Sequence, residues 1–188
     1  MRVSVTISFK TRWIPLSGKN FCTSTLGKAI AENYGYRQLD TDDYFWLPTD
    51  PPFVTNRERP ERLRLLRKDL DASQRVVISG SLYDWGDDIL PEVTLGVRVI
   101  TPTEVRIERL REREYARFGE RIREGGDMYR DHLEFVEWAN GYDFDGPEVR
   151  SKQGHDREEQ GLCCPIIRMD GTRPVEETLA AIAAFSPF

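Results

Sequence analysis

Short apolar runs that alternate with helical patterns constrain the fold of this chain more than any other feature of its sequence. These runs are rich in β-branched residues and fall at 3–7, 76–79, 95–100 and 165–169, with a weaker run at 36–39. Strands that alternate with helices form βαβ crossovers, which build largely parallel sheets with helices on both faces. We therefore predict an α/β fold of three layers around a mostly parallel, five-stranded sheet.

The helix signals fill the intervals between these runs. Residues 101–104 read Thr-Pro-Thr-Glu and offer an N-cap, a proline in the first turn and a favourable glutamate, so we expect a helix to about 118. A chain of 188 residues is long enough for one domain with a substantial core. We expect a single domain over 1–188, with a mainly polar lid or insert of helical pieces at about 113–160.

Charge and composition narrow the expected partners and compartment. A net charge of −5 gives no general attraction to nucleic acid or to an anionic membrane. Three cysteines, two of them adjacent, make no disulfide framework and favour a reducing compartment. The sequence shows neither an apolar run near the roughly 18 residues of a membrane span nor a secretory signal. We expect a cytoplasmic protein with no nucleic-acid or membrane partner.

The segment 17–28 stands where a phosphate-binding loop would stand, between the first expected strand and a helix. The standard loop reads Gly-x4-Gly-Lys-[Ser/Thr], whereas the aligned positions here hold Ser17, Cys22, Thr23 and Ser24. A helix N-terminus near Thr23 would still attract an anion, and the adjacent hydroxyls could ligate Mg²⁺. An ordinary N-cap explains the same residues. The candidate phosphate-binding residues are Gly18, Lys19, Cys22, Thr23, Ser24 and Thr25, with Lys19 as a displaced cation.

Acidic residues directly follow the weak strand at 36–39. Open α/β sheets bind ligands at the carboxyl ends of their strands, so Asp40 and Asp42 could accept a substrate hydroxyl or hold Mg²⁺ through water. Turn and capping chemistry is the alternative, because aspartate is common in both. We take Asp40 and Asp42 as candidate catalytic residues, and Ser24 with Asp42 as candidate metal ligands.

Four arginines are spaced by three or four residues in the helix expected after 101, so they share one face: Arg106, Arg109, Arg113 and Arg117. Guanidinium groups on one face can clamp phosphate oxygens as a lid closes, and we take Arg109 and Arg113 as candidate catalytic residues. Glutamates at 104, 108 and 112 interleave with them, and a solvated helix laced with ion pairs explains the same pattern.

The two histidines carry no recognisable motif. Neither His132 nor His155 has a cysteine or acidic partner at metal-ligand spacing. We expect both on the solvated surface. No set of serine, histidine and aspartate can be assembled from the sequence.

Several stretches together resemble the P-loop small-molecule kinases, bacterial proteins described as adenylate-kinase-like or shikimate-kinase-like. The most specific is the aromatic and acidic stretch 39–53, LDTDDYFWLPTDPPF. The others are TSTLGKAIAE at 23–32, ISGSL at 78–82, ERLRERE at 108–114 and MDGTRPVEE at 169–177. The resemblance implies ATP and Mg²⁺ as cofactors and a P-loop kinase-like fold with a helical lid.

The same resemblance implies roles for individual residues. Thr23, Ser24 and Thr25 would sit at the triphosphate and Mg²⁺, Asp40 and Asp42 would face the phosphoryl acceptor, Arg109 and Arg113 would belong to the lid, and Arg173 and Pro174 to the loop beside the adenine. The expected function is transfer of the ATP γ-phosphoryl group to a small metabolite or nucleotide. A non-catalytic nucleotide-binding or interaction module and a nucleotide hydrolase remain alternatives, because the fold cannot separate them.

Overall fold

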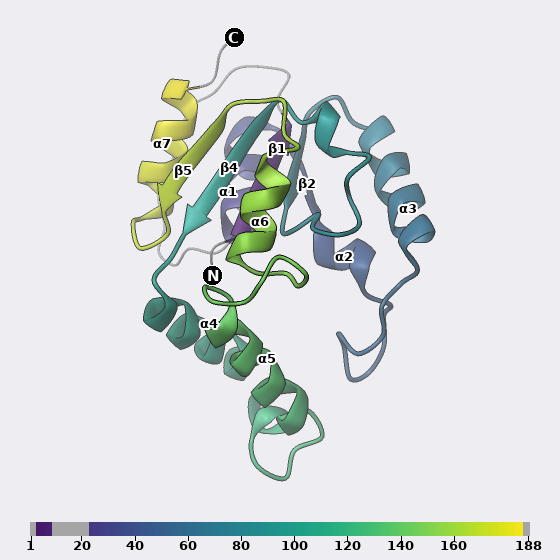
Figure 1. Ribbon diagram of the computed structural model, residues 1–188, viewed down its shortest axis with the longest axis vertical. Helices are drawn as coiled ribbons and strands as arrows, with labels where there is room; N and C mark the ends of the chain where they lie inside the picture. The colour runs from purple at the N-terminus through teal and green to yellow at the C-terminus, as the bar shows by residue number, and fades with distance from the viewer. Residues whose placement is uncertain (1–2, 9–22, 186–188) are drawn as a thin grey trace.

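A five-stranded sheet forms the centre of the computed structural model, which describes residues 3–8 and 23–185 (Figure 1). The strands lie in the order β2-β3-β1-β4-β5. Their bounds are β1 Val3–Ser8, β2 Arg37–Asp40, β3 Val76–Ser79, β4 Leu95–Ile100 and β5 Ile166–Asp170. Each of the five apolar runs therefore forms a strand.

The strand directions differ from those expected. Parallel pairing is confined to two separate pairs, β2 with β3 and β4 with β5. Between them, β1 runs antiparallel to both β3 and β4. The mixed α/β class is correct, but the mostly parallel sheet and the three-layer P-loop kinase-like fold built on it are wrong. The physical reason is that apolar, β-branched runs favour strands of either direction, and only the crossover rule predicts a parallel direction.

The reversed direction of β1 determines which edge of the sheet it reaches. Ser8, the last residue of β1, lies opposite Val76, the first residue of β3. The carboxyl ends of β2 and β3, at Asp40 and Ser79, lie together at the other edge. A phosphate loop of the expected kind needs the first strand to end beside its neighbours. Here β1 ends at the opposite edge.

Helices follow the strands in the order expected from the alternation. The α-helices are α1 Thr23–Tyr34, α2 Thr41–Phe45, α3 Arg59–Asp71, α4 Thr103–Phe118, α5 Tyr129–Gly141, α6 Lys152–Glu159 and α7 Val175–Phe185, and the 3-10 turns are η1 Leu90–Glu92 and η2 Gly119–Ile122. The helix expected to end near 118 is confirmed as α4. Within the described ranges, no helix combines the length and apolarity needed to cross a bilayer.

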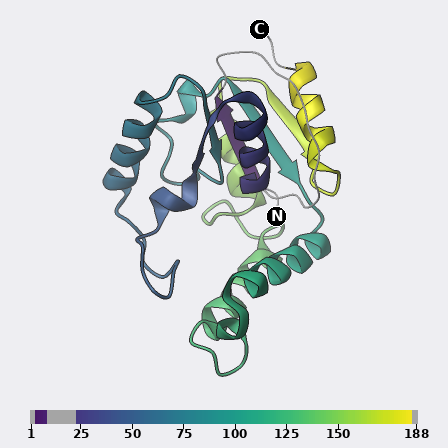
Figure 2. The same ribbon diagram turned by 180° about the vertical axis from the view of Figure 1, so that it is seen from behind.

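Two apolar clusters pack against the central sheet. Leu26 and Ile30 of α1 and Leu179 of α7 join Val97 of β4 in the first cluster, and all four side chains are buried. Figure 2 shows α1 in front of the strands. The second cluster joins α3 to β2, β3 and the 82–90 segment, with Trp85 among its buried residues. Burial of a leucine or isoleucine side chain contributes about 1.5–3 kcal/mol, so these clusters hold the sheet in place.

The pair α4 and α5 projects beyond the edge of the sheet, at the bottom of Figure 1. Ile107 and Leu110 of α4 pack on Val136 and Ala139 of α5 and form a small third cluster. Helix α6 instead lies on the face of the sheet opposite α1, as the two views show (Figures 1 and 2). The region expected as an insert at about 113–160 therefore contains both a projecting helical pair and a helix attached to the sheet.

Candidate functional site

A cavity of about 990 Å³ opens where β2 and β3 end. Its walls come from the first turn of α1, from α2 and the 46–56 loop, from α4 and α5, and from residues of the 142–155 segment. The volume lies at the upper end of the range for small-molecule sites. Charged and hydroxyl side chains from distant parts of the chain face this space, so it is the candidate functional site.

Hydroxyl and carboxylate groups form one side of the cavity. Ser24 Oγ in the first turn of α1 donates a hydrogen bond to Asp40 Oδ2 at 2.5 Å. The second oxygen, Asp40 Oδ1, accepts from the backbone N–H of Asp42 at 3.1 Å and so caps α2. Gln38 Nε2 donates to the carbonyl of Ser24 and to Ser79 Oγ, which ties α1 to β2 and β3. The predicted metal pair was Ser24 with Asp42, whereas the carboxylate bonded to Ser24 is that of Asp40.

Asp42 presents a carboxylate to the interior of the cavity. Its side chain is accessible to solvent there. The surrounding protein limits its hydration, and this desolvation, together with the negative charge of Asp40, raises the pKa of Asp42, while the positive charges of Arg150 and Arg113 oppose the rise. A carboxylate with a raised pKa is a stronger proton acceptor than an ordinary aspartate, which suits it to general base catalysis.

The cavity that contains Asp40 and Asp42 is also lined by three guanidinium groups, those of Arg113, Arg117 and Arg150. Arg150 stacks over the ring of Trp138 at 4.6 Å, and burial lowers the pKa of its guanidinium. Arg117 stacks over Phe53 at 4.7 Å. These three guanidinium groups make no hydrogen bond to a carboxylate of the described chain, since the nearest, Glu114 to Arg113, is 3.8 Å away. Their N–H groups are therefore available to bind an anion.

The structure brings together six of the residues proposed from the sequence. Those that line the cavity are Thr23, Ser24, Thr25, Asp40, Asp42 and Arg113. Arg109, Arg173 and Pro174 do not belong to its described lining. Arg109 Nη1 instead donates to the carbonyl of Gly171 at 2.6 Å, and Arg173 pairs with Glu177 at 2.8 Å. Gly18, Lys19 and Cys22 lie outside the described residues.

The two histidines do not lie on the solvated surface as predicted from the sequence. His155 is only 1 % exposed, and it contacts Ser81 Oγ at 2.8 Å and the Tyr142 hydroxyl at 2.6 Å. His132 is half-buried on the cavity wall. The expectation of two surface histidines is therefore wrong. No local pattern marks His155, because its partners are 74 and 13 residues away in the sequence.

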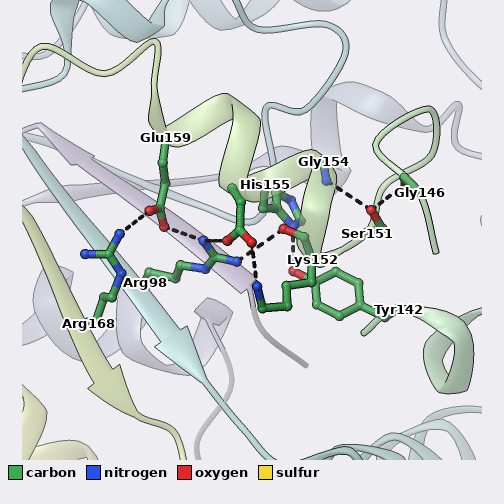
Figure 3. Close-up of polar contacts among 10 residues, drawn as sticks. Arg98, Tyr142, Gly146, Ser151, Lys152, Gly154, His155, Glu159 and Arg168 are labelled. Atoms are coloured by element: carbon green, nitrogen blue, oxygen red, sulfur yellow. Dashed lines mark hydrogen bonds and ion pairs between the residues drawn. The ribbon is translucent and has the colours of Figure 1, made fainter. Parts of the chain in front are cut away.

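A buried ion network attaches α6 to the sheet. Figure 3 shows Arg98 reaching from β4 to this helix. Its Nη1 contacts Asp156 at 2.5 Å and Glu159 at 2.6 Å, and the Arg98 side chain is only 4 % exposed. Arg168 of β5 also pairs with Glu159. The network holds α6 against the sheet, and α6 carries His155, which lines the cavity.

Glu158 in the same helix supplies a test of this packing. Its Oε1 is buried without a hydrogen-bond partner in the described chain. Burial, then the charge of Asp87, raises the pKa of Glu158 from 4.5 to about 7. The folded state therefore holds this proton more tightly than the unfolded state, and the stability it contributes is lost as the pH rises through about 7.

Replacing Glu158 by glutamine should remove this loss. At a pH of about 8, Glu158→Gln should raise the free energy of unfolding by roughly 1–2 kcal/mol over the parent. The gain should shrink as the pH falls toward 4.5, the ordinary value for this group. Urea unfolding at several pH values measures it, and Glu137→Gln, an exposed carboxylate on α5, is the control. A gain in the free energy of unfolding that does not depend on pH would contradict a raised pKa of Glu158.

The fold and the cavity together define a mixed α/β protein with a large cavity lined by polar and charged side chains. No known family profile matches the chain. Over 155 residues it is 39% identical to the "Uncharacterized protein YqaC" of Bacillus subtilis (strain 168), and the matched region covers 82% of this chain and 85% of that protein. The chain therefore belongs to the same family as YqaC.

Proposed function

We propose that the protein binds ATP and transfers its terminal phosphoryl group to a hydroxyl of a small metabolite or nucleotide. The observation that carries the proposal is the composition of one cavity: the Ser24–Asp40 pair, the carboxylate of Asp42 and three arginines all line it. Phosphoryl transfer needs these kinds of group, because its catalysis consists mainly of positioning and of charge stabilisation. The proposal rests on this site and not on a P-loop fold.

The first turn of α1 supports the placement of the nucleotide phosphates. The free backbone N–H groups of a helix N-terminus and its dipole favour an anion, and the side chains of Thr23 and Thr25 line the cavity at this point. An ATP triphosphate at this position would lie beside the Ser24–Asp40 pair. Its terminal phosphate would then face the arginine side of the cavity.

The same pair fits a magnesium ion. Ser24 and Asp40 offer the hydroxyl and carboxylate oxygens that Mg²⁺ prefers, and Mg²⁺ commonly takes few protein ligands and completes its coordination with water and substrate phosphates. The described residues contain no group of three or more histidine, cysteine or acidic side chains that could hold a metal unaided. When bound, the ion would neutralise charge on the phosphates.

Asp42 and the arginines supply the chemistry of transfer. The acceptor hydroxyl oxygen would form a bond to the γ-phosphorus while the bond from that phosphorus to the ADP oxygen breaks. The proton of the hydroxyl would pass to Asp42, whose raised pKa favours that step. Arg113 and Arg117 would stabilise the negative charge on the phosphoryl oxygens as it shifts toward the leaving group.

ATP with Mg²⁺ is expected to raise the melting temperature of the protein. At 100 times the dissociation constant, binding linkage contributes about 2.7 kcal/mol, which corresponds to a rise of roughly 5–10 °C for a chain of this size. Differential scanning fluorimetry measures the rise. Ser24→Ala should reduce the part that depends on Mg²⁺, and Ser73→Ala, which removes a hydroxyl bonded to the exposed Arg37, is the matched control.

Product analysis then separates transfer from its alternatives. The protein is incubated with ATP, Mg²⁺ and a panel of sugars, polyols, nucleosides and nucleotides, and the products are followed by phosphorus NMR. A phosphorylated acceptor formed together with ADP supports the proposal. Phosphate release that needs no acceptor would indicate a hydrolase, and ATP binding without turnover across the panel would indicate a binding module. Either of these results contradicts the proposal.

A further inference from the structure

Three buried polar side chains form a hydrogen-bonded chain along the cavity wall. Ser81 follows β3, Tyr142 follows α5 and His155 belongs to α6, and all three line the cavity. Ser81 Oγ lies 2.8 Å from His155 Nε2, and the Tyr142 hydroxyl lies 2.6 Å from His155 Nδ1. Figure 3 shows His155 and Tyr142 facing one another. The three side chains are 7 %, 1 % and 2 % exposed, in the order serine, histidine, tyrosine.

Ser81, His155 and Tyr142 together carry one more polar hydrogen than there are hydrogen bonds between their side chains. Burial and the positive charge of Arg150 lower the pKa of His155 to about 3, so its ring is neutral at physiological pH. A neutral imidazole carries one N–H, and the two hydroxyls carry one proton each. The two contacts Ser81–His155 and His155–Tyr142 use two of these three protons. One hydroxyl proton therefore has no acceptor within the chain of three.

The geometry indicates which hydroxyl carries the extra proton. A phenol is a stronger acid than an aliphatic alcohol and hence the better donor to an imidazole nitrogen, and the tyrosine contact is the shorter one. Tyr142 then donates to Nδ1, and Nε2–H donates to Ser81 Oγ. The backbone N–H of Tyr83 donates to the same oxygen at 3.2 Å. Both lone pairs of Ser81 are thereby used, and its own O–H is left to donate elsewhere.

We propose that Ser81 and Arg150 form an oxyanion subsite, which binds a phosphate or carboxylate group of the substrate. Both residues line the cavity, and the guanidinium of Arg150 makes no hydrogen bond to another described side chain. A hydroxyl donor and a guanidinium that line the same cavity suit an anionic group, because charge-assisted hydrogen bonds are the strongest available to such a ligand. The identification of this ligand as the phosphoryl acceptor rests on the proposed function; the anion site itself does not.

Tyr142 and His155 act in this arrangement as positioning residues. Neither needs to contact the ligand, because Tyr142 fixes the tautomer of His155 and His155 fixes the direction of the Ser81 hydroxyl. Thr41 Oγ1 accepts from the backbone N–H of Ser81 at 3.0 Å and holds the main chain of Ser81 in place. The donor is therefore oriented before the ligand arrives, which reduces the entropic cost of binding.

The first experiment tests the hydrogen bonds between Ser81, His155 and Tyr142 in the absence of any ligand. Nitrogen-15 NMR of the wild-type protein, with His155 assigned by comparison with His155→Gln, reports which ring nitrogen carries the proton. We expect the proton on Nε2, and we expect Tyr142→Phe to shift the ring toward protonation of Nδ1. A wild-type ring protonated at Nδ1 would overturn the proposal, because Ser81 would then donate to the histidine. This measurement does not depend on how well any variant of Ser81 folds.

The second experiment measures anion binding with two defined probes, inorganic phosphate and succinate, by isothermal titration calorimetry. Ser81→Ala should weaken binding of the better probe about tenfold, and Tyr142→Phe should weaken it by a smaller factor although Ser81 is intact. Ser73→Ala should change nothing. The probe that binds more tightly identifies the anionic group. Equal affinity in Ser81→Ala and in the parent, or no binding of either probe, would overturn the proposal.

The outcomes for the subsite and for the proposed function are separable. Stabilisation by ATP and Mg²⁺ should persist in Ser81→Ala, because the first turn of α1 is unchanged. Anion binding that depends on Ser81, found in a protein that transfers no phosphoryl group, would support the subsite and refute the transfer. Transfer that is unaffected by Ser81→Ala, in its rate and in its KM for the acceptor, would refute the assignment of this subsite to the phosphoryl acceptor.

Discussion

Replacing Asp42 by asparagine is expected to abolish phosphoryl transfer while leaving ATP binding nearly intact. The amide has nearly the same size and still occupies the cavity wall, but it cannot take the proton of the acceptor hydroxyl. Loss of a general base commonly costs 10²–10⁴-fold in rate, so we expect a fall in kcat of about that size. The Ser24–Asp40 pair, which we assign to the nucleotide side, keeps its hydrogen bond in this variant.

The measurement compares single-turnover transfer with the ATP-dependent shift in melting temperature. Asp43→Asn is the matched control, because Asp43 lies next in α2, also lines the cavity and has a pKa that is likewise raised by burial. It should retain most of the rate. A parallel loss of transfer and of ATP binding in Asp42→Asn would place Asp42 on the nucleotide side and refute its role as the base.

The pH dependence supplies a second test of the same residue. The base works in its ionised form, so the rate should fall as the pH drops through the pKa of Asp42. Because desolvation and the charge of Asp40 raise this pKa, the fall should begin at a higher pH than for an ordinary aspartate. The residual activity of Asp42→Asn should lack this acidic limb.

Replacing Arg98 by methionine is expected to lower the free energy of unfolding by about 3–5 kcal/mol. Methionine fills much of the space, but it leaves Glu159 without its buried partner, and the carboxylate of Glu159 is only 10 % exposed. Removing one member of a buried ion pair costs more than the pair contributes, because the remaining charge stays desolvated. The loss should also loosen α6.

Urea unfolding measures the change. Arg168→Met is the matched control, since Arg168 pairs with the same Glu159 but is 57 % exposed, and exposed pairs contribute about 0–1 kcal/mol. The double variant Arg98→Met/Glu159→Gln should recover part of the stability by removing the unpaired charge. Equal effects of Arg98→Met and Arg168→Met would show that burial does not distinguish the two arginines.

The sequence allowed the strands to be located but not their directions. Apolar, β-branched runs mark β3 and β4 because these strands are buried on both faces. The same pattern is compatible with either direction of a strand. The antiparallel course of β1 depends on its pairing with Val77 and Val97, 70 and 92 residues away from the partner positions Ile7 and Val5. Such contacts leave no local trace.

The candidate site was predictable where its chemistry is local. Asp40 and Asp42 follow a strand, and Ser24 lies at the start of a helix, so short-range patterns indicated all three. Arg113 and Arg109 share one stripe of α4, yet Arg109 donates to Gly171 and Arg113 lines the cavity, because the neighbours of a helix change along its length. Only tertiary packing brings Ser81, Arg150 and His155 to the same cavity, so no spacing rule could have connected them.

The small separate core between α4 and α5 affects how readily one wall of the cavity opens. The wall that carries Arg113 and Arg117 belongs to α4, whose apolar cluster with α5 contains four buried residues. Asp40 and Asp42 instead stand on or beside strands that the larger central clusters cover. Amide hydrogens in proteins exchange through local openings, whose free energy follows the amount of apolar surface each unit buries. The wall that α4 forms is therefore expected to open at a lower cost in free energy than the elements that carry Asp40 and Asp42.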